Sequence, residues 1–285
     1  MKRLIFLLTT YFLLGSTMET GAQNRILRIA HTSDTHSCIE PLSAKQKEAE
    51  LSSTAGFARR VAVINELREQ GEDDLLVFDC GDFSQGSVYY NLFHGDTEVE
   101  LMNLMHIDAC TLGNHEFDFG LENLARLIRK ANFPFVCCNY DFTGTPCEGL
   151  VKPYIVKERA GVRVGILGVG VQPEGLITQE NYLPMRYTEP AKAAQPIINR
   201  LRNEEHCDVV ICLSHLGWTD EPGGDKEFIE GTTGLDILLG GHTHTQFQHI
   251  GLYHDAKWHA VHADHVGKNA SYVGLMEIEV ARSAK

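Results

Sequence analysis

The fold is decided by ACTLGNHEFDFG, residues 109–120, in which a short apolar run leads directly into a polar turn. Residues 109–112 predict a brief buried strand that ends before Gly113. The same arrangement occurs four more times, with a polar cluster just beyond an apolar run. These clusters are Asp34-Thr35-His36, Gly81-Asp82, Ser214-His215 and Gly241-His242-Thr243-His244. Because ligands gather beyond the carboxyl ends of strands in open α/β sheets, all five clusters are candidates for one site.

Strands and helices alternate along the chain. Apolar runs at 26–30, 75–78, 135–138, 209–213 and 237–239 predict buried strands, and helical spacing recurs at 57–67, 121–128 and 191–204. Thr97 and Glu100 form a capping-box pattern that predicts a helix through Met105. A hairpin is expected over 154–169, and the tail, at 258–262 and 272–280, suggests antiparallel strands. This order predicts a layered α/β fold with mixed sheets.

The first 22 residues form a targeting segment. A basic start at Lys2 and Arg3 precedes a mostly apolar stretch, and small residues come before Gln23. This pattern predicts a signal peptide over 1–22 that is cleaved after Ala22, so we expect a periplasmic or secreted protein. The apolar stretch is shorter than the roughly 20 residues of a membrane span, so no membrane span is expected. Residues 23–285 then form one domain.

The formal charge of −13 argues against a nucleic acid partner, because binding to a phosphate backbone needs clustered cations.

Eight cysteines make disulfides possible in an exported chain. Cys80, Cys110 and Cys212 lie in or beside apolar runs and are interpreted as core residues. The remaining candidates for pairing are close in sequence around a turn, and they are Cys137, Cys138 and Cys147.

The five polar clusters differ in how specific they are. Asp-x-His and Gly-Asp alone are typical of turns, and a single histidine such as His215 is typical of a hydrogen-bonded, partly buried side chain. GNHE at 113–116 and GHTH at 241–244 are more specific. All five in this order, each at a strand end, favour a metal site.

This order resembles the calcineurin-like metallophosphoesterases, and within them the catalytic domain of the periplasmic 5′-nucleotidase and UDP-sugar hydrolase family. The matching stretches are HTSDTH at 31–36, CGDF at 80–83, GNHEFDFG at 113–120, SHLG at 214–217 and GGHTH at 240–244. The resemblance implies an αββα sandwich of two mixed sheets flanked by helices. It also implies phosphoester hydrolysis at two metal ions, with a nucleotide or a related small phosphoester as substrate.

The family pattern assigns seven side chains to the two ions. One ion would be held by Asp34, His36, Asp82 and His244, and the other by Asp82, Asn114, His215 and His242, so that Asp82 bridges. Imidazole, carboxylate and amide donors suit Zn, Mn, Co or Fe rather than calcium. A water bound to such ions ionises near neutral pH, and we expect the resulting hydroxide to attack phosphorus.

Two further residues are candidates for catalysis. His115 would protonate the leaving oxygen, and Asp118 would orient its ring, as the family's His-Asp pair implies. Asp118 could also be a helix N-cap. Glu116 is interpreted as structural or as a support of the ligands, and Phe117 and Phe119 are interpreted as core residues rather than as a base-stacking platform. The tail histidines could form a further metal site, but a solvated surface is the preferred interpretation; they are His249, His254, His259, His262 and His265.

The chain departs from two-domain nucleotidases, which carry a second domain that stacks the nucleobase. Residues 23–285 match only the catalytic part, so we expect a separately encoded nucleoside-binding domain or a different substrate. Ser37-Cys38 also stands where relatives often have Gly-His. Two alternatives therefore stay open: a hydrolase of sulfur-linked or pyrophosphate substrates, and a metal-binding subunit that is active only with a companion chain.

Overall fold

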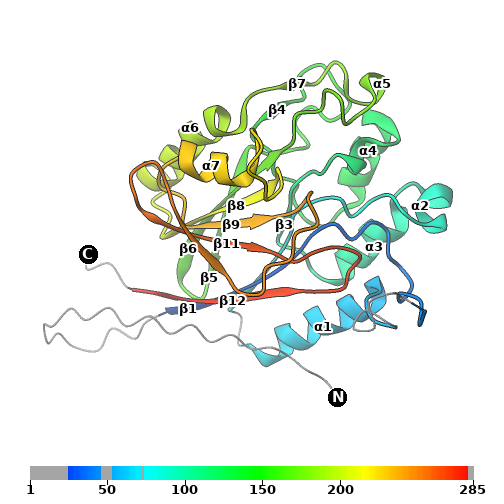
Figure 1. Ribbon diagram of the computed structural model, residues 1–285, viewed down its shortest axis with the longest axis horizontal. Helices are drawn as coiled ribbons and strands as arrows, with labels where there is room; N and C mark the ends of the chain where they lie inside the picture. The colour runs from blue at the N-terminus through cyan, green and yellow to red at the C-terminus, as the bar shows by residue number, and fades with distance from the viewer. Residues whose placement is uncertain (1–24, 46–52, 72–73, 282–285) are drawn as a thin grey trace, which may run out of the picture.

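The structure is a computed structural model that describes residues 25–45, 53–71 and 74–281. The predicted signal segment, 1–22, lies outside the described residues. Two large sheets pack face to face, and helices cover the outer face of each (Figure 1). The predicted αββα sandwich of two mixed sheets is therefore confirmed.

The first sheet has four strands in the order β12-β1-β2-β3. Strands β1, β2 and β3 run parallel to one another, and β12 lies antiparallel to β1 at the edge of the sheet. The strands are β1 (Arg25–Thr32), β2 (Leu75–Asp79), β3 (Ala109–Cys110) and β12 (Gly274–Val280).

The second sheet has six strands in the order β10-β11-β9-β8-β6-β5. Its four central strands are parallel, and both edge strands are antiparallel to their neighbours. The strands are β5 (Tyr154–Arg159), β6 (Val162–Gly170), β8 (Val209–His215), β9 (Ile237–Gly240), β10 (Gly251–His254) and β11 (Ala260–His265). The predicted hairpin over 154–169 is β5 and β6, with left-handed residues at its turn.

The helices divide between the two outer faces. The first sheet is covered by α1 (Phe57–Gln70), α3 (Asp96–Leu104) and α4 (Gly120–Lys130). The second is covered by α6 (Pro190–Asn203) and α7 (Asp225–Gly231). Shorter elements are α2 (Val88–Phe93), the 3₁₀ helix η2 (His115–Phe117), α5 (Gln179–Tyr182) and a small sheet of β4 (Tyr140–Asp141) with β7 (Arg186–Tyr187).

The apolar runs are continuous because both faces of each sheet are buried. In β2, Leu76 and Phe78 pack between the sheets, whereas Leu75 and Val77 face the helices. In the second sheet, Ile211 of β8 likewise points between the sheets. Side chains alternate along a strand, so each parallel strand contributes to two cores at once.

Three predicted elements differ from the structure. The capping box is wrong, because α3 begins at Asp96 after Gly95, whose φ of 98° sets the turn without a side-chain cap. The predicted strand at 135–138 makes only isolated bridges, to Cys110 and Lys152. The two tail strands enter opposite sheets: β11 lies parallel to β9, and β12 is antiparallel to β1. Sequence alone did not show which partner each one takes.

All eight cysteines are free, so the pairing group around Cys137, Cys138 and Cys147 contains no disulfide. Several cysteines serve as core residues instead, since Cys80, Cys110 and Cys212 are fully buried, as expected.

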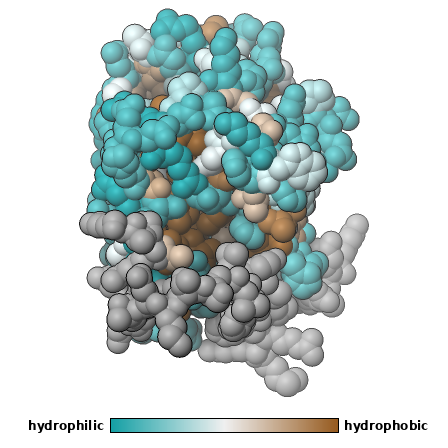
Figure 2. All heavy atoms as spheres, turned by 90° about the vertical axis from the view of Figure 1, so that its left-hand side faces the viewer, coloured by the Kyte–Doolittle hydropathy of each residue, from teal (hydrophilic) through white to brown (hydrophobic). Residues whose placement is uncertain are grey.

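Among the described residues, every helix is too short or too polar to span a membrane. Hydrophilic side chains cover most of the face in Figure 2, and hydrophobic atoms show in a hollow near its middle.

Candidate metal centre

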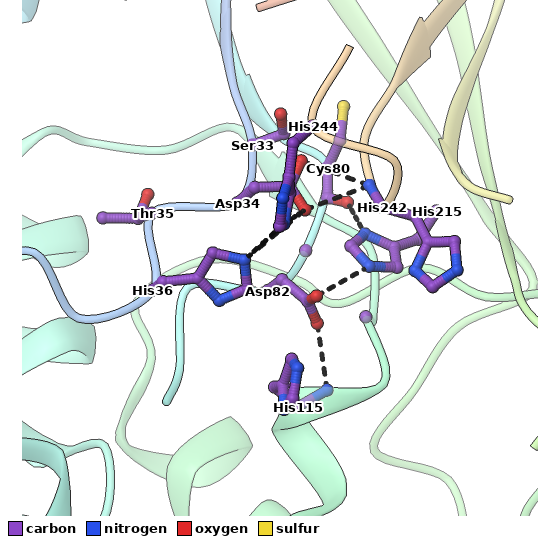
Figure 3. Close-up of polar contacts among 12 residues, drawn as sticks. Ser33, Asp34, Thr35, His36, Cys80, Asp82, His115, His215, His242 and His244 are labelled. Atoms are coloured by element: carbon purple, nitrogen blue, oxygen red, sulfur yellow. Dashed lines mark hydrogen bonds and ion pairs between the residues drawn. The ribbon is translucent and has the colours of Figure 1, made fainter. Parts of the chain in front are cut away.

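Six of the seven predicted ligands meet at one end of the sandwich, although they come from four separate strand ends (Figure 3). The seventh, Asn114, lies beside them in the chain, because the backbone N–H of the next residue, His115, donates to Asp82 Oδ1. Asp34 and His36 follow β1, Asp82 follows β2, and Asn114 follows β3. From the second sheet, His215 ends β8, and the pair His242 and His244 follows β9. The carboxyl ends of parallel strands in both sheets therefore supply the whole set.

The carboxylates and imidazoles form two groups. In the first, atoms of Asp34, His36 and His244 all lie within 4.8 Å of one another. His36 Nε2 is 2.8 Å from His244 Nε2 and 4.0 Å from Asp34 Oδ1. The second group contains Asp82, His215 and His242 with the same spacing. These groups correspond to the two ligand sets that the family pattern implies.

Asp82 lies between the two groups. Its Oδ2 atom is 3.1 Å from His215 Nε2 in the second group. Asp82 also forms a cluster with His36, from the first group, and with His115. Its Oδ1 atom accepts a hydrogen bond from the backbone N–H of His115 at 2.9 Å. This position is the one expected of a bridging carboxylate.

Two buried polar atoms of the site have no hydrogen-bond partner: Asn114 Oδ1 and His36 Nδ1. Asn114 is 8% exposed, so water does not compensate for the missing partner of its amide oxygen. Leaving a buried acceptor unpaired costs about 1–3 kcal/mol. A cation bound beside Asn114 would satisfy the amide oxygen, so the residues fit a pair of divalent metal ions.

The charges of the site are strongly coupled. Burial lowers the pKa of His215, but the charges of Asp82 and Asp34 and the hydrogen bonds to Asp82 and to the Cys80 carbonyl together outweigh this and raise the pKa to about 10. For Asp82, burial raises the pKa, but His215 and other histidines hold it well below its usual range. Burial lowers the pKa of His36 and of His242 to about 4. The latter two rings are therefore neutral and have a lone pair to donate.

Groups behind the ligands fix their orientation. The carbonyl of Cys80 lies 2.6 Å from His215 Nδ1 and accepts its proton, which leaves Nε2 for a metal. The backbone N–H of His242 donates to Asp34 Oδ1 at 3.0 Å. Glu116 is buried and accepts three backbone N–H groups, from Asp82, Ser84 and Gly113. This geometry agrees with the structural interpretation of Glu116.

The backbone of the site is strained. Five of the seven predicted ligands have a positive φ: 47° at Asp34, 46° at His36, 53° at Asp82, 75° at His242 and 56° at His244. Such values are uncommon outside glycine and are found mainly at turns and functional sites. Gly113 allows this close packing, because a Cβ there would lie 2.1 Å from Asp82 Oδ1. The strain is an independent sign that these turns serve a function.

The predicted catalytic pair is also assembled. His115 Nδ1 lies 3.0 Å from Asp118 Oδ2, and the His115 ring is 5.5 Å from the His36 ring between centroids. Both side chains are about one third exposed, so a substrate can reach them. The N-cap of α4 is Phe119, and no side chain caps the helix. The alternative role of Asp118 as a helix cap is therefore wrong.

Two buried polar supports of the site were not predicted from the sequence. Arg60 is 3% exposed on α1 and donates to Thr35 Oγ1, inside the first ligand turn. Ser37 donates to the buried Glu98 of α3. A signal for Arg60 was present, because it follows Phe57 by three residues and precedes Ile64 by four, on the buried face of the predicted helix.

The tail histidines do not form a metal group among the described residues. Three of them are exposed, as expected: His249, His254 and His259. His265 differs, because it is 1% exposed and its Nε2 lies 2.9 Å from Asp225 Oδ2. Asp225 in turn accepts the hydroxyl proton of Ser214, next to His215. His265 thus belongs to the support of the metal centre rather than to a solvated surface.

An αββα sandwich with paired metal-ligand groups at the strand ends defines the class of dimetal phosphoesterases. Residues 27–246 match the Calcineurin-like phosphoesterase family, and the chain belongs to that family.

Among its relatives, the snake venom 5′-nucleotidase of Crotalus adamanteus is 32% identical over 236 residues, covering 81% of this chain and 39% of that protein. The apyrase of Tabanus yao is 31% identical, covering 80% of this chain and 40% of its own length. The crystal structure of a 5′-nucleotidase precursor from Thermus thermophilus matches with a TM-score of 0.80 at 28% identity, covering 90% of this chain and 53% of that one. The chain thus spans about 40% of the length of these curated relatives.

Proposed function

We propose that this chain is an exported phosphoester hydrolase that depends on two divalent metal ions and resembles 5′-nucleotidases in its substrates. The observation that carries this proposal is the convergence of six carboxylate and imidazole donors into two groups beside the His115–Asp118 pair. Relatives named 5′-nucleotidase support nucleoside 5′-monophosphates as the first substrates to test. The predicted signal segment at 1–22 supports export to the periplasm or beyond.

The residues of the centre would hold two ions, one at Asp34, His36 and His244 and the other at Asn114, His215 and His242. Asp82 would contact both. The mixed nitrogen and oxygen donors suit Zn, Mn, Co or Fe. When bound, such ions supply Lewis acidity and lower the pKa of a coordinated water to near neutrality. The fixed backbone of the strand ends keeps these donors in place during turnover.

His115 would act on the leaving group. Asp118 accepts a hydrogen bond from Nδ1, so the proton that His115 can deliver sits on Nε2. Burial lowers the pKa of His115, but Asp118 and Asp82 together raise it above its ordinary value. This shift favours the imidazolium, which can transfer its Nε2 proton to the departing oxygen of the substrate.

A dedicated nucleoside-recognition domain would be supplied in addition to these residues. We propose that a separately encoded chain or a further domain recognises the nucleoside in the manner of the longer relatives. In its absence, the catalytic part would still cleave small phosphoesters.

The test is turnover by the purified chain loaded with Mn²⁺ or Zn²⁺. The substrates are adenosine 5′-monophosphate, 4-nitrophenyl phosphate, pyrophosphate and a thiosulfate ester. We expect phosphate release from the first two and its loss on treatment with EDTA. Cleavage of only the sulfur ester would overturn the substrate class. No turnover of any of the four would favour a binding subunit that needs a companion chain.

A further inference from the structure

Phe119 is exposed although the sequence places it among core residues. Its exposed fraction is 40%, whereas Phe117, two residues earlier, is fully buried. Single large apolar side chains at the surface are common. Phe119 differs because it directly follows Asp118, the residue that contacts the proposed proton donor His115. The prediction that Phe119 is a core residue is wrong, since η2 ends at Phe117 and α4 begins only at Gly120.

The Phe119 ring belongs to a three-ring group. His94 stacks on it with a centroid separation of 4.0 Å and an interplanar angle of 23°. Tyr90, which is 2% exposed, packs against Phe119 at 5.1 Å. We call Phe119 and His94 the aromatic shelf, because both residues are exposed while Tyr90 supports them from below.

The position of the shelf is fixed by α4. The carbonyl of His94 accepts a hydrogen bond from Asn123 Nδ2 at 3.0 Å and another from Arg126 Nη2 at 3.2 Å. His94 itself ends α2 in the left-handed conformation with φ of 51°. Figure 1 shows α2 and α4 on the same side of the molecule. A surface held in this way loses little conformational freedom when a ligand binds.

The shelf is connected to the proposed proton donor. Tyr90 Oη donates to the backbone carbonyl of His115 at 3.2 Å, and Asp118, the neighbour of Phe119, contacts the His115 ring. A phosphate at the metal centre would place its leaving oxygen at His115. The next part of the leaving group would then extend past Asp118 toward the shelf.

We propose that Phe119 and His94 bind the aromatic ring of the substrate's leaving group by stacking. This inference rests on the proposed phosphoester hydrolysis, and it narrows the substrate class to phosphoesters with an aromatic leaving group such as a nucleoside. A planar base offers a π face of the size of these rings, and stacking on aromatic side chains is tolerant of base identity. The catalytic part would then contribute to substrate selection without a second domain.

The aromatic shelf could instead be covered by a protein partner, and the test must distinguish this from binding of a substrate ring. Helix α2 also exposes apolar side chains, with Val88 at 62%, Leu92 at 68% and Phe93 at 50%. If a protein partner covers this side of the molecule, Phe119 would be part of that interface, and its removal would not change catalysis by the isolated chain. Phe93 provides the matched control, because it is an exposed phenylalanine of α2 outside the three-ring group.

The test compares two phosphomonoesters with the full chain loaded with Mn²⁺: adenosine 5′-monophosphate and glycerol 3-phosphate. We expect Phe119→Ala to lower the ratio of their kcat/KM values by about tenfold. Phe119→Tyr should restore the ratio, and Phe93→Ala should leave it unchanged. An unchanged ratio in Phe119→Ala would overturn the shelf while leaving the proposed hydrolysis intact, as would an equal fall in Phe93→Ala.

Adenosine binding provides a second readout that does not require turnover. Saturation-transfer NMR should detect contact of the adenine protons with the wild-type chain, and Phe119→Ala should weaken the signal relative to Phe93→Ala. If neither ester is hydrolysed but this difference is seen, the shelf stands and the proposed hydrolysis fails. Absence of adenosine contact in the wild-type chain would overturn the shelf.

Discussion

His115 Nδ1 lies 3.0 Å from Asp118 Oδ2, and this contact orients an imidazole that the paired ligand groups do not require. The two residues are three positions apart, on either side of the end of η2. The contact leaves Nε2 as the ring nitrogen that can meet a substrate. A histidine oriented by a carboxylate next to a metal centre can serve in metal binding or in proton transfer, and we propose the second role for His115.

Replacement of His115 by alanine should separate these two roles. We expect His115→Ala to bind two metal ions per chain, as the wild type does, because the seven donors are unchanged. Turnover should fall by about 10²–10⁴-fold, the usual contribution of general acid catalysis. Metal content by mass spectrometry and kcat for adenosine 5′-monophosphate measure the two effects, because the alkoxide that leaves from this ester needs a proton. Loss of metal in this variant would contradict the assigned role.

Asp118→Asn tests the orienting contact itself. The amide keeps the size of the side chain but removes the negative charge that favours the protonated ring. We expect a smaller loss than in His115→Ala, of about 10–100-fold in kcat, with metal content unchanged. The double variant should be no slower than His115→Ala alone, because Asp118 acts only through that ring. Additive losses would show that Asp118 has a separate function.

Glu116 should prove essential for stability. Its carboxylate accepts N–H groups from Asp82, Ser84 and Gly113, and alanine would leave these donors buried without partners. At about 1–3 kcal/mol for each orphaned group, Glu116→Ala should lower the free energy of unfolding by at least about 3 kcal/mol. Urea denaturation measures the change, with the exposed Glu174→Ala as control. Equal stabilities of the two variants would refute the proposed role of Glu116.

Asp255 should stabilise the protein in a pH-dependent manner. Burial raises its pKa, but N–H groups of Gly234, His259 and Lys257 outweigh this and hold the pKa well below its usual range. Its contribution is therefore fully present above the unfolded pKa of about 3.9 and is lost as the pH falls below that value.

We expect Asp255→Ala to lower the free energy of unfolding by about 2–4 kcal/mol at pH 6. The difference from wild type should narrow by about 1 kcal/mol at pH 3. Asp220→Ala is the control, since that side chain is 90% exposed and carries the same charge. Urea unfolding at the two pH values measures the change. A difference that does not vary with pH would contradict this account.

Much of the fold and of the candidate site could be predicted from local pattern. The parallel strands carry apolar side chains on both faces, so β2 and β8 were visible as short continuous runs. The polar residues that follow them were visible because a histidine or aspartate after such a run has no place in a core. His36 and His244, 208 positions apart, were predicted to meet, and their Nε2 atoms lie 2.8 Å apart.

What could not be predicted depends on partners distant in sequence. The buried His265 contacts Asp225, the first residue of α7, which lies 40 positions earlier in the chain. The start of α3 depended on Gly95, where a Cβ would lie 2.6 Å from Leu127 Cδ1 of another helix. Phe119 was assigned to the core together with Phe117, but no local pattern reveals which of the two rings is left exposed.

The central claim is that two divalent ions sit among these seven side chains, and the most direct measurement is anomalous diffraction from crystals of the protein loaded with Mn²⁺. We expect two peaks joined by Asp82, one beside Asp34, His36 and His244 and the other beside Asn114, His215 and His242. A single peak, or a peak coordinated by His115 in place of these ligands, would contradict the account.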